Sequence, residues 1–145
     1  MRFYPDEVPE FEFEPLKNRF EIRKFENGFG YGIVSNAEFE PGQIVFAFTG
    51  FLLDRMTQFS LETPEGKHLH DPFFMGKLLH SCDPNTTCDM NRRVFVATKK
   101  IVPGTVVTMD YEQTESRLFK AFECHCGAKN CKGLIRGYLF QRAAV

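Results

Sequence analysis

The sequence predicts a β-rich fold in one domain. Short runs of β-forming residues recur at close spacing, and turns rich in Pro, Gly and Asn separate them. No stretch carries the sustained helical period that a parallel α/β sheet would need in its crossovers. A chain of 145 residues can bury one hydrophobic core, and 17 Phe with no Trp indicate a core built largely on Phe. We therefore expect a single β-rich domain without a long linker.

Residues 1–19 are expected to form an extended lead-in to this domain. Acidic residues alternate there with prolines, which oppose helix formation. The Phe residues of the segment are expected on the surface, where Phe11 and Phe13 could mediate contacts in a homodimer.

Two strands with a glycine turn between them should come next. Apolar residues alternate over 20–22, Gly and Asn break the pattern over 27–32, and β-formers resume at 33–34. A Pro-Gly turn at 40–42 precedes a further β-forming run at 44–48.

The second half of the chain predicts more strands. Residues 52–79 lack a sustained period and are assigned to short strands and loops. Two strands, at 93–99 and 106–111, should flank the Pro-Gly turn at 102–104. Residues 115–122 could form one or two helical turns.

Charge and hydropathy exclude several classes of function. With 18 basic and 19 acidic residues the net charge is −1, so a basic surface for direct nucleic-acid binding is not expected. No apolar run approaches the roughly 20 residues of a membrane helix, and the first residues lack the apolar stretch of a signal peptide. We expect a soluble intracellular protein, in either cytoplasm or nucleus.

The cysteines predict a zinc site. Three of the five lie within eight residues, with the spacing C-x-C-x4-C: Cys124, Cys126 and Cys131. Such a cluster suits a metal in a reducing compartment better than a disulfide framework. A closed structural zinc site needs a fourth ligand, which is Cys82, Cys88 or His125. His125 stands between two ligands and is awkwardly placed to point the same way as both.

Four motifs follow one another along the chain. A glycine motif, N-G-F-G-Y-G, covers 27–32, and H-S-C-D-P-N covers 80–85. T-M-D-Y covers 108–111, and the cysteine motif at 124–131 is followed by Lys-Gly. In this order the motifs resemble the SET-domain methyltransferase family, and the resemblance extends over nearly the whole chain.

The resemblance implies a fold and a zinc ligand set. It implies a SET domain over 20–118, made of small curved β-sheets with a C-terminal pseudoknot, and a zinc-binding post-SET tail over 119–145. In the family the cysteine of H-S-C is the fourth zinc ligand. This favours Cys82 and leaves Cys88 as a buried or free thiol.

The resemblance also implies an activity, the transfer of a methyl group from S-adenosylmethionine to an amine, chiefly a protein or peptide lysine. Tyr111 would be the catalytic residue, beside the sulfonium and the target amine. Met109 falls where the family limits the number of methyl groups added, although a Met there could equally fill a gap in the core.

A further set of residues is implied to bind the cofactor. The backbone around Gly30 would hold its amino-acid end, because a Cβ there would obstruct close approach. His80 would offer its backbone to the adenine, and an apolar residue of the tail would cover the ring. The implied cofactor-binding residues are Phe29, Gly30, Tyr31, Leu79, His80, Tyr111 and Leu134.

Leu79 departs from the family, which has Asn at this position. The loss of polar contacts to the cofactor could weaken binding by about ten- to a hundred-fold. The departure leaves three alternatives: a weakly active methyltransferase, one specialised for an unusual substrate, and a domain that kept the fold and lost the chemistry. The candidate functions are accordingly a protein-lysine methyltransferase, a methyltransferase for a small amine, and an inactive interaction module.

Overall fold

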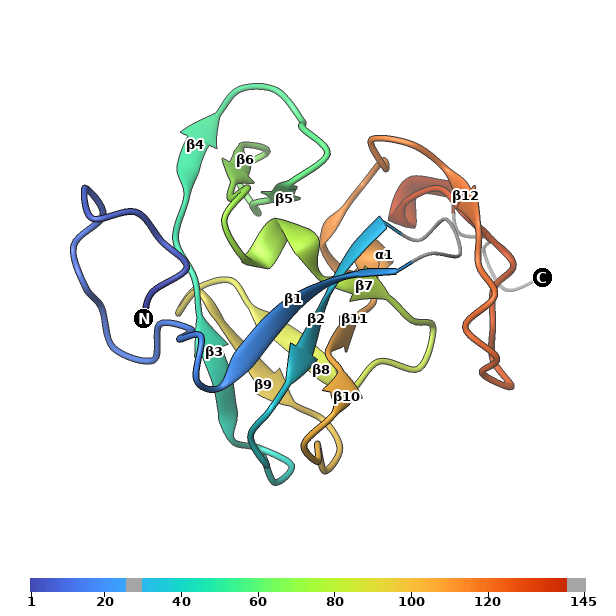
Figure 1. Ribbon diagram of the computed structural model, residues 1–145. Helices are drawn as coiled ribbons and strands as arrows, with labels where there is room; N and C mark the ends of the chain where they lie inside the picture. Colours follow the sequence, from blue (N-terminus) through green and yellow to red (C-terminus); the bar gives the residue numbers. More distant parts are fainter. Residues whose placement is uncertain (26–29, 141–145) are drawn as a thin grey trace.

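The computed structural model describes residues 1–25 and 30–140. Small sheets with no more than three strands each make up this part of the chain (Figure 1). The strands in chain order are β1 (Phe20–Phe25), β2 (Gly30–Ser35), β3 (Ile44–Ala47), β4 (Phe51–Leu53), β5 (Ser60–Glu62), β6 (His68–His70), β7 (Leu79–His80), β8 (Thr86–Asp89), β9 (Val94–Ala97), β10 (Thr105–Val106), β11 (Thr108–Met109), β12 (Phe122–Glu123) and β13 (Leu134–Ile135). The helices are η1 (Met75–Lys77), α1 (Tyr111–Thr114) and η2 (Tyr138–Phe140).

Three sheets have three strands, in the orders β1-β2-β10, β3-β9-β8 and β4-β6-β5. The first two contain the strands that the alternating patterns predict, with β1 and β2 antiparallel and Phe20 opposite Ser35. Within β2 the apolar residues Ile33 and Val34 are fully buried, and Ile33 packs in the main core. The expectation of a β-rich fold is confirmed.

A parallel pair of short strands brings two distant motifs together. Strand β7 pairs with β11, with Leu79 opposite Thr108 and His80 opposite Met109. The H-S-C segment therefore lies beside the segment that leads into Tyr111, although about 30 residues separate them in the sequence. This pairing places the main residues of the site.

The core contains the expected Phe residues. Phe46 stacks on Phe95 with ring centroids 5.0 Å apart and contacts the edge of Phe74 at 4.9 Å. These rings are fully buried and join strands of one sheet to η1. Such aromatic pairs add to the free energy gained by burial.

The short helix lies earlier in the chain than predicted. Helical turns were expected at 115–122, but α1 spans Tyr111–Thr114 and the following residues are irregular. The reason is a cap: the Asp110 side chain accepts a hydrogen bond from the Glu112 amide at 2.9 Å and so starts the helix there.

The N-terminal segment is irregular but does not run straight into β1. Arg2 and Leu16 form a β-bridge, so the segment loops back on itself (Figure 1). Phe13 is exposed, whereas Phe3 and Phe11 are partly buried against the core, which corrects the expectation that the segment's Phe residues lie on the surface. Tyr4 is buried and donates a hydrogen bond of 2.6 Å to Asp71.

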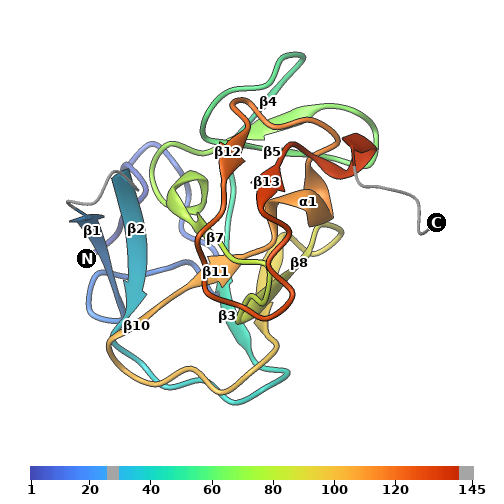
Figure 2. The same cartoon turned by 90° about the vertical axis from the view of Figure 1, so that its right-hand side faces the viewer.

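The C-terminal tail forms a second, smaller apolar cluster. Strands β12 and β13 pair antiparallel, and Ile135 packs with buried Cys82 and Cys124. The tail crosses in front of β7 and β11, next to α1 (Figure 2). None of the helices in the described ranges is long and apolar enough to cross a membrane.

Candidate functional site

Four cysteine thiols converge where the tail meets the H-S-C segment. The Sγ atoms of Cys82, Cys124, Cys126 and Cys131 all lie within 4.8 Å of one another, and those of Cys82 and Cys124 are 3.8 Å apart. Thiolates held at about 2.3 Å around a tetrahedral zinc ion are roughly 3.8 Å apart. The group therefore fits a closed site that could hold a metal ion such as zinc.

The two other candidates for the fourth ligand lie elsewhere. The His125 side chain is 70% exposed and faces Glu123. Cys88 packs against the main core, and its amide donates to the Gln113 side chain at 3.2 Å. Neither residue belongs to the group of thiols.

Hydrogen bonds also hold the tail against Cys82. The Asn130 side chain donates to the Cys82 carbonyl at 3.0 Å, and the Lys132 amide donates to the Cys82 Sγ at 3.3 Å. Gly127 and Gly133 adopt positive φ angles of 78° and 77°, which turn the chain around the thiols.

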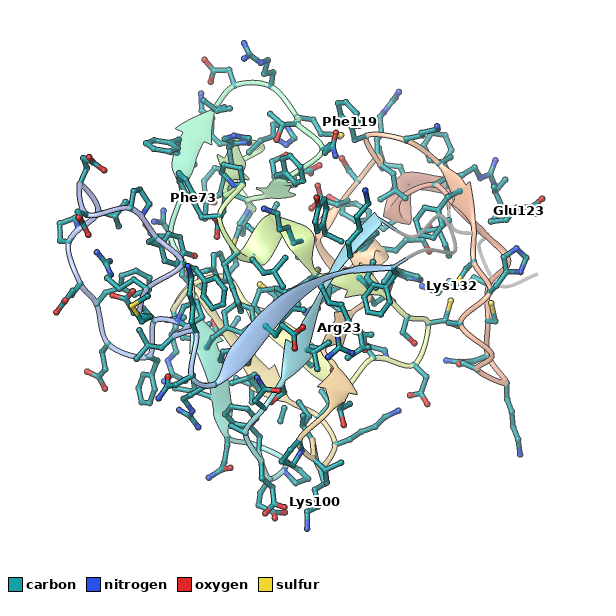
Figure 3. The ribbon with its side chains drawn as sticks, in the orientation of Figure 1. Arg23, Phe73, Lys100, Phe119, Glu123 and Lys132 are labelled. Atoms are coloured by element: carbon teal, nitrogen blue, oxygen red, sulfur yellow. The ribbon has the colours of Figure 1, made fainter. Side chains whose placement is uncertain are left out.

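A second attachment of the tail runs through Glu112 in α1. Its Oε2 atom accepts hydrogen bonds from the Arg136 and Gly137 amides at 3.1 and 3.0 Å. Lys132 reaches the same carboxylate through Oε1 at 3.1 Å and also contacts Asp110 at 3.0 Å. Figure 3 shows Lys132 on the tail near these elements. The helix that begins with Tyr111 is thus tied directly to the tail.

The larger cleft lies between the body of the domain and the tail. Its volume is about 530 Å³, within the usual range for small-molecule sites. It is lined by Leu79, His80, Ser81, Thr108, Tyr111, Phe122, Glu123, Cys124, His125 and Cys126. Leu79, His80 and Tyr111, all expected at the cofactor, therefore meet in one cleft.

The other expected cofactor residues are placed differently. Phe29 lies outside the described residues. Gly30, Tyr31 and Leu134 do not line the larger cleft in the part of the chain that the structure describes. Leu134 is half-exposed and pairs with Glu123, which does line it. The roles of these residues in binding stay predictions.

Gly30 and Gly32 are each required by a different feature of the local structure. Gly30 has a φ of 73° and open space where a Cβ would lie, so its backbone conformation accounts for the glycine. A Cβ on Gly32 would lie 2.6 Å from the Phe25 ring and 2.8 Å from the Leu79 side chain. Leu79 is thus packed directly on β2, where only a glycine leaves room for it.

Tyr111 also lines a smaller cavity. Its volume is about 320 Å³. It is lined by Thr57, Gln58, Ser60, Leu61, Met75, Gly76, Leu78, Met109, Tyr111, Glu115, Leu118, Phe119, Lys120 and Phe122. Met109 is buried in the core and also faces this cavity, so both interpretations of its position describe part of its surroundings.

Phe122 is a site residue that sequence reasoning missed. It lines both cavities, and its ring meets the edges of His80 and Tyr111 with centroids 5.7 and 6.0 Å apart. The available signal was its position two residues before Cys124, on a segment that the thiol group holds in place. Phe119, labelled in Figure 3, lies on the outer loop before β12 and is exposed.

Tyr111 is fixed at both ends. Its hydroxyl donates a hydrogen bond to the Leu78 carbonyl, and its amide donates to the His80 Nδ1 atom at 3.0 Å. Burial, with a smaller effect of Glu115, raises the pKa of the Tyr111 hydroxyl. The phenol therefore stays protonated, its proton is donated to the Leu78 carbonyl, and its oxygen can still accept a hydrogen bond.

His80 connects Tyr111 to the cluster of four thiols. Its Nδ1 accepts the Tyr111 amide, so the proton of the neutral ring resides on Nε2, which is 3.4 Å from the Cys82 Sγ. Burial lowers the pKa of His80, against the opposing effect of Asp110. The neutral imidazole thus bridges the segment of the thiols and the start of α1.

Comparison with known proteins identifies the family. The SET domain profile matches residues 30–112, more than half of the chain. The chain belongs to the SET-domain family. The resemblance that the four motifs indicate is thereby confirmed, and the small sheets of this SET domain agree with the fold class that the resemblance implies.

Two relatives match part of this SET domain. Histone-lysine N-methyltransferase Set2 of Drosophila melanogaster is 27% identical over 132 residues, covering 74% of this chain and 6% of the relative. Methyltransferase flvH of Aspergillus flavus is 37% identical over 68 residues, covering 46% of this chain and 38% of the relative. The chain thus spans well under half the length of each.

Solved structures share the fold. KRYPTONITE in complex with mCHG DNA and SAH matches with a TM-score of 0.63 at 23% identity, covering 79% of this chain and 28% of that chain. KRYPTONITE in complex with mCHH DNA, H3(1-15) peptide and SAH matches with a TM-score of 0.61 at 21% identity, covering 79% and 29%.

Proposed function

We propose that this SET domain transfers a methyl group from S-adenosylmethionine to an amine, with a protein lysine as the substrate. The observation that carries the proposal is that Tyr111 lines both the larger cleft and the smaller cavity. A residue shared by two cavities suits a reaction between two ligands, one bound in each. The name of the Drosophila relative and the SAH and H3 peptide bound by KRYPTONITE support this assignment.

The larger cleft is proposed to hold the cofactor, which supplies a methyl group on a positively charged sulfur. Leu79 and His80 lie on its wall, and Phe122 offers an aromatic face from the tail. The backbone of Phe29, Gly30 and Tyr31 would bind the amino-acid end, and Leu134 would cover the adenine from outside. Zinc bound by the four cysteines would keep the tail, and hence Phe122, in position.

Methyl transfer is an in-line displacement, so alignment and exclusion of water are the main tasks of the protein. Tyr111 is partly buried, and the position of its hydroxyl is fixed by the Leu78 carbonyl. With its proton donated to Leu78, the hydroxyl oxygen would accept a hydrogen bond from the amine and contact the polarised methyl group, an interaction that grows in the transition state. Phe122, which packs on Tyr111, would shield the reacting atoms from solvent.

A small amine is the second candidate substrate. The smaller cavity, at about 320 Å³, lies at the low end of the range for pockets that enclose small molecules. The Aspergillus relative is named only as a methyltransferase. An inactive interaction module stays the third candidate, because Leu79 occupies the position of a polar cofactor contact.

Protein or peptide partners fit this proposal better than nucleic acid. KRYPTONITE binds DNA in the matched complexes, but this chain has a net charge of −1 and covers less than a third of that protein. A homodimer through the N-terminal segment stays a prediction, in which exposed Phe13 would be a contact residue.

Calorimetric titration of S-adenosylmethionine into zinc-replete protein tests the proposal. We expect saturable binding by the unaltered protein and by the Cys88→Ser variant, but loss of binding in Cys126→Ser, because only Cys126 belongs to the thiol group. An absence of binding by the unaltered protein would favour the interaction module.

The substrate class needs a separate experiment. Lysine peptide arrays and a panel of small primary amines, each with isotopically labelled S-adenosylmethionine, would test the first two candidates directly against each other. Labelling of peptides supports the protein-lysine substrate, whereas labelling of small amines alone supports the second candidate.

A further inference from the structure

Glu115 is a buried carboxylate on the wall of the smaller cavity. It follows α1 as its C-terminal cap, where its amide donates to the Tyr111 carbonyl at 2.9 Å, so the two residues are anchored to each other. Only 6% of the residue is exposed, and it lines the cavity that Tyr111 also lines. Nothing in the resemblance to SET domains assigns a role to this position.

The two oxygens of the Glu115 carboxylate differ in their hydrogen bonds within the described residues. Oε2 accepts hydrogen bonds from the Glu62 amide and the Thr114 hydroxyl, both at 2.8 Å. Among residues 1–25 and 30–140, no donor reaches Oε1 and no cation lies within 4.0 Å of the carboxylate. A buried carboxylate without a counter-ion is costly, so the site is suited to a cation that arrives from the cavity.

The charged and titratable groups around Glu115 come from several elements. Glu62 on β5 adds a second negative charge, and its own carboxylate is held by Ser116 and by the Tyr138 hydroxyl of η2. Tyr111 of α1 is neutral, and Lys120 lines the same cavity from the loop before β12. Burial, aided by repulsion from Glu62, raises the pKa of Glu115 to about 7.

We propose that Glu115 binds the ammonium group of the substrate in the smaller cavity and takes its proton before methyl transfer. The inference rests on the proposed function. An N–H bond of the ammonium breaks, its electron pair stays on nitrogen, and an O–H bond forms on Glu115. The lone pair then forms the N–C bond, while the electrons of the C–S bond leave with sulfur. Glu115 finally releases its proton to solvent.

Glu115→Gln tests this role, with Glu38→Gln as a matched control that removes an exposed carboxylate. We expect Glu115→Gln to bind S-adenosylmethionine like the unaltered protein and to lose about 100-fold or more in kcat/KM, the usual size of general-base catalysis. The kcat/KM of the unaltered protein should rise with pH through about 7, and this rise should be absent in the variant. A variant within threefold of the unaltered protein, with the same pH profile, overturns the proposal.

A second variant keeps the test decisive if Glu115→Gln folds poorly. Glu62→Gln removes the repulsion that raises the pKa of Glu115, so the rise in kcat/KM should move to lower pH. An unmoved profile contradicts the assignment of that titration to Glu115.

Binding of n-butylammonium, followed by NMR, separates this proposal from the proposed function. We expect the unaltered protein to bind it and Glu115→Gln to bind at least about tenfold more weakly. Failure to bind S-adenosylmethionine counts against the proposed function alone. A protein that binds the cofactor but does not respond to n-butylammonium overturns the role of Glu115.

Discussion

Tyr111 lines both cavities, and replacement of its hydroxyl isolates the chemical role of that group. Tyr111→Phe keeps the ring that packs on His80 and Phe122 but removes the donor to the Leu78 carbonyl. We expect kcat to fall by about 100-fold or more with cofactor affinity nearly unchanged. Single-turnover kinetics together with calorimetry would check this, and full activity would refute the assignment.

Leu79 offers a gain-of-function test at the same scale. It packs on Gly32 at the wall of the larger cleft, where the family has a polar Asn. Leu79→Asn should tighten S-adenosylmethionine binding by about tenfold, since a hydrogen bond in a buried site contributes about 1–1.5 kcal/mol. Lost packing should lower the unfolding free energy by about 1–3 kcal/mol. Weaker binding in calorimetry would show that Leu79 is itself a cofactor contact.

Glu115 also predicts how stability depends on pH. Its pKa is about 7 in the folded protein and 4.5 in its unperturbed state, so the folded state binds more protons between these values. The free energy of unfolding should therefore decrease as pH rises through this window. Glu115→Gln should flatten the decrease. Urea unfolding between about pH 5 and about pH 8 measures it, and parallel curves for the two proteins would contradict the burial of an ionisable carboxylate.

At the scale of elements, the tail is held by two attachments of different chemistry. The cluster of four thiols joins Cys82 to β12 and the turns around it. Glu112 joins α1 to the Arg136 and Gly137 amides. Both attachments act on the segment that carries Phe122. Correct placement of this aromatic residue therefore depends on the four thiols and on Glu112 together.

Metal removal should release the tail without unfolding the main core. The thiols belong to the smaller apolar cluster, whereas the Phe-rich cluster lies in the body of the domain. After chelation we expect faster amide exchange over 122–136 and little change over β1 to β3. Cys126→Ser should show the same faster exchange over 122–136 without a chelator. Cys88→Ser should exchange like the unaltered protein. Uniform loss of protection would indicate instead that the whole domain depends on the metal.

At the scale of the whole molecule, the N-terminal segment and the tail lie on opposite sides (Figure 1). The segment is attached through Tyr4 to Asp71, a fully buried carboxylate that also accepts hydrogen bonds from the Phe73, Phe74 and Met75 amides. These amides lead into η1, whose Met75 and Gly76 line the smaller cavity. The first residues of the chain thus support one wall of the site.

Tyr4→Phe tests this support. The buried Asp71 oxygen loses one partner, so we expect the free energy of unfolding to fall by about 1–3 kcal/mol. The affinity for S-adenosylmethionine should stay unchanged, because no residue of η1 lines the larger cleft. Urea unfolding and calorimetry on the same samples check both statements. A variant as stable as the unaltered protein would contradict the first of them.

The sequence by itself determined the features that depend on local patterns and residue chemistry. Alternating apolar residues predicted β1 and β9, and β-forming residues after a glycine turn predicted β2. The spacing of three cysteines predicted a metal site because thiolates so close together suit zinc. The order of four motifs predicted the SET-domain family. The resemblance to this family also implied a role for Tyr111, which lines both cavities.

The tertiary structure decided which distant residues meet. Pairing of β7 with β11 placed Leu79 and His80 beside Tyr111, and the thiol group selected Cys82 over Cys88 and His125. Burial of Glu115 carried no local signal, and the position of Phe122 two residues before Cys124 did not indicate that it lines two cavities. These features arise from contacts between segments far apart in the chain, and the energies of such contacts depend on burial and distance, which residue order alone does not encode.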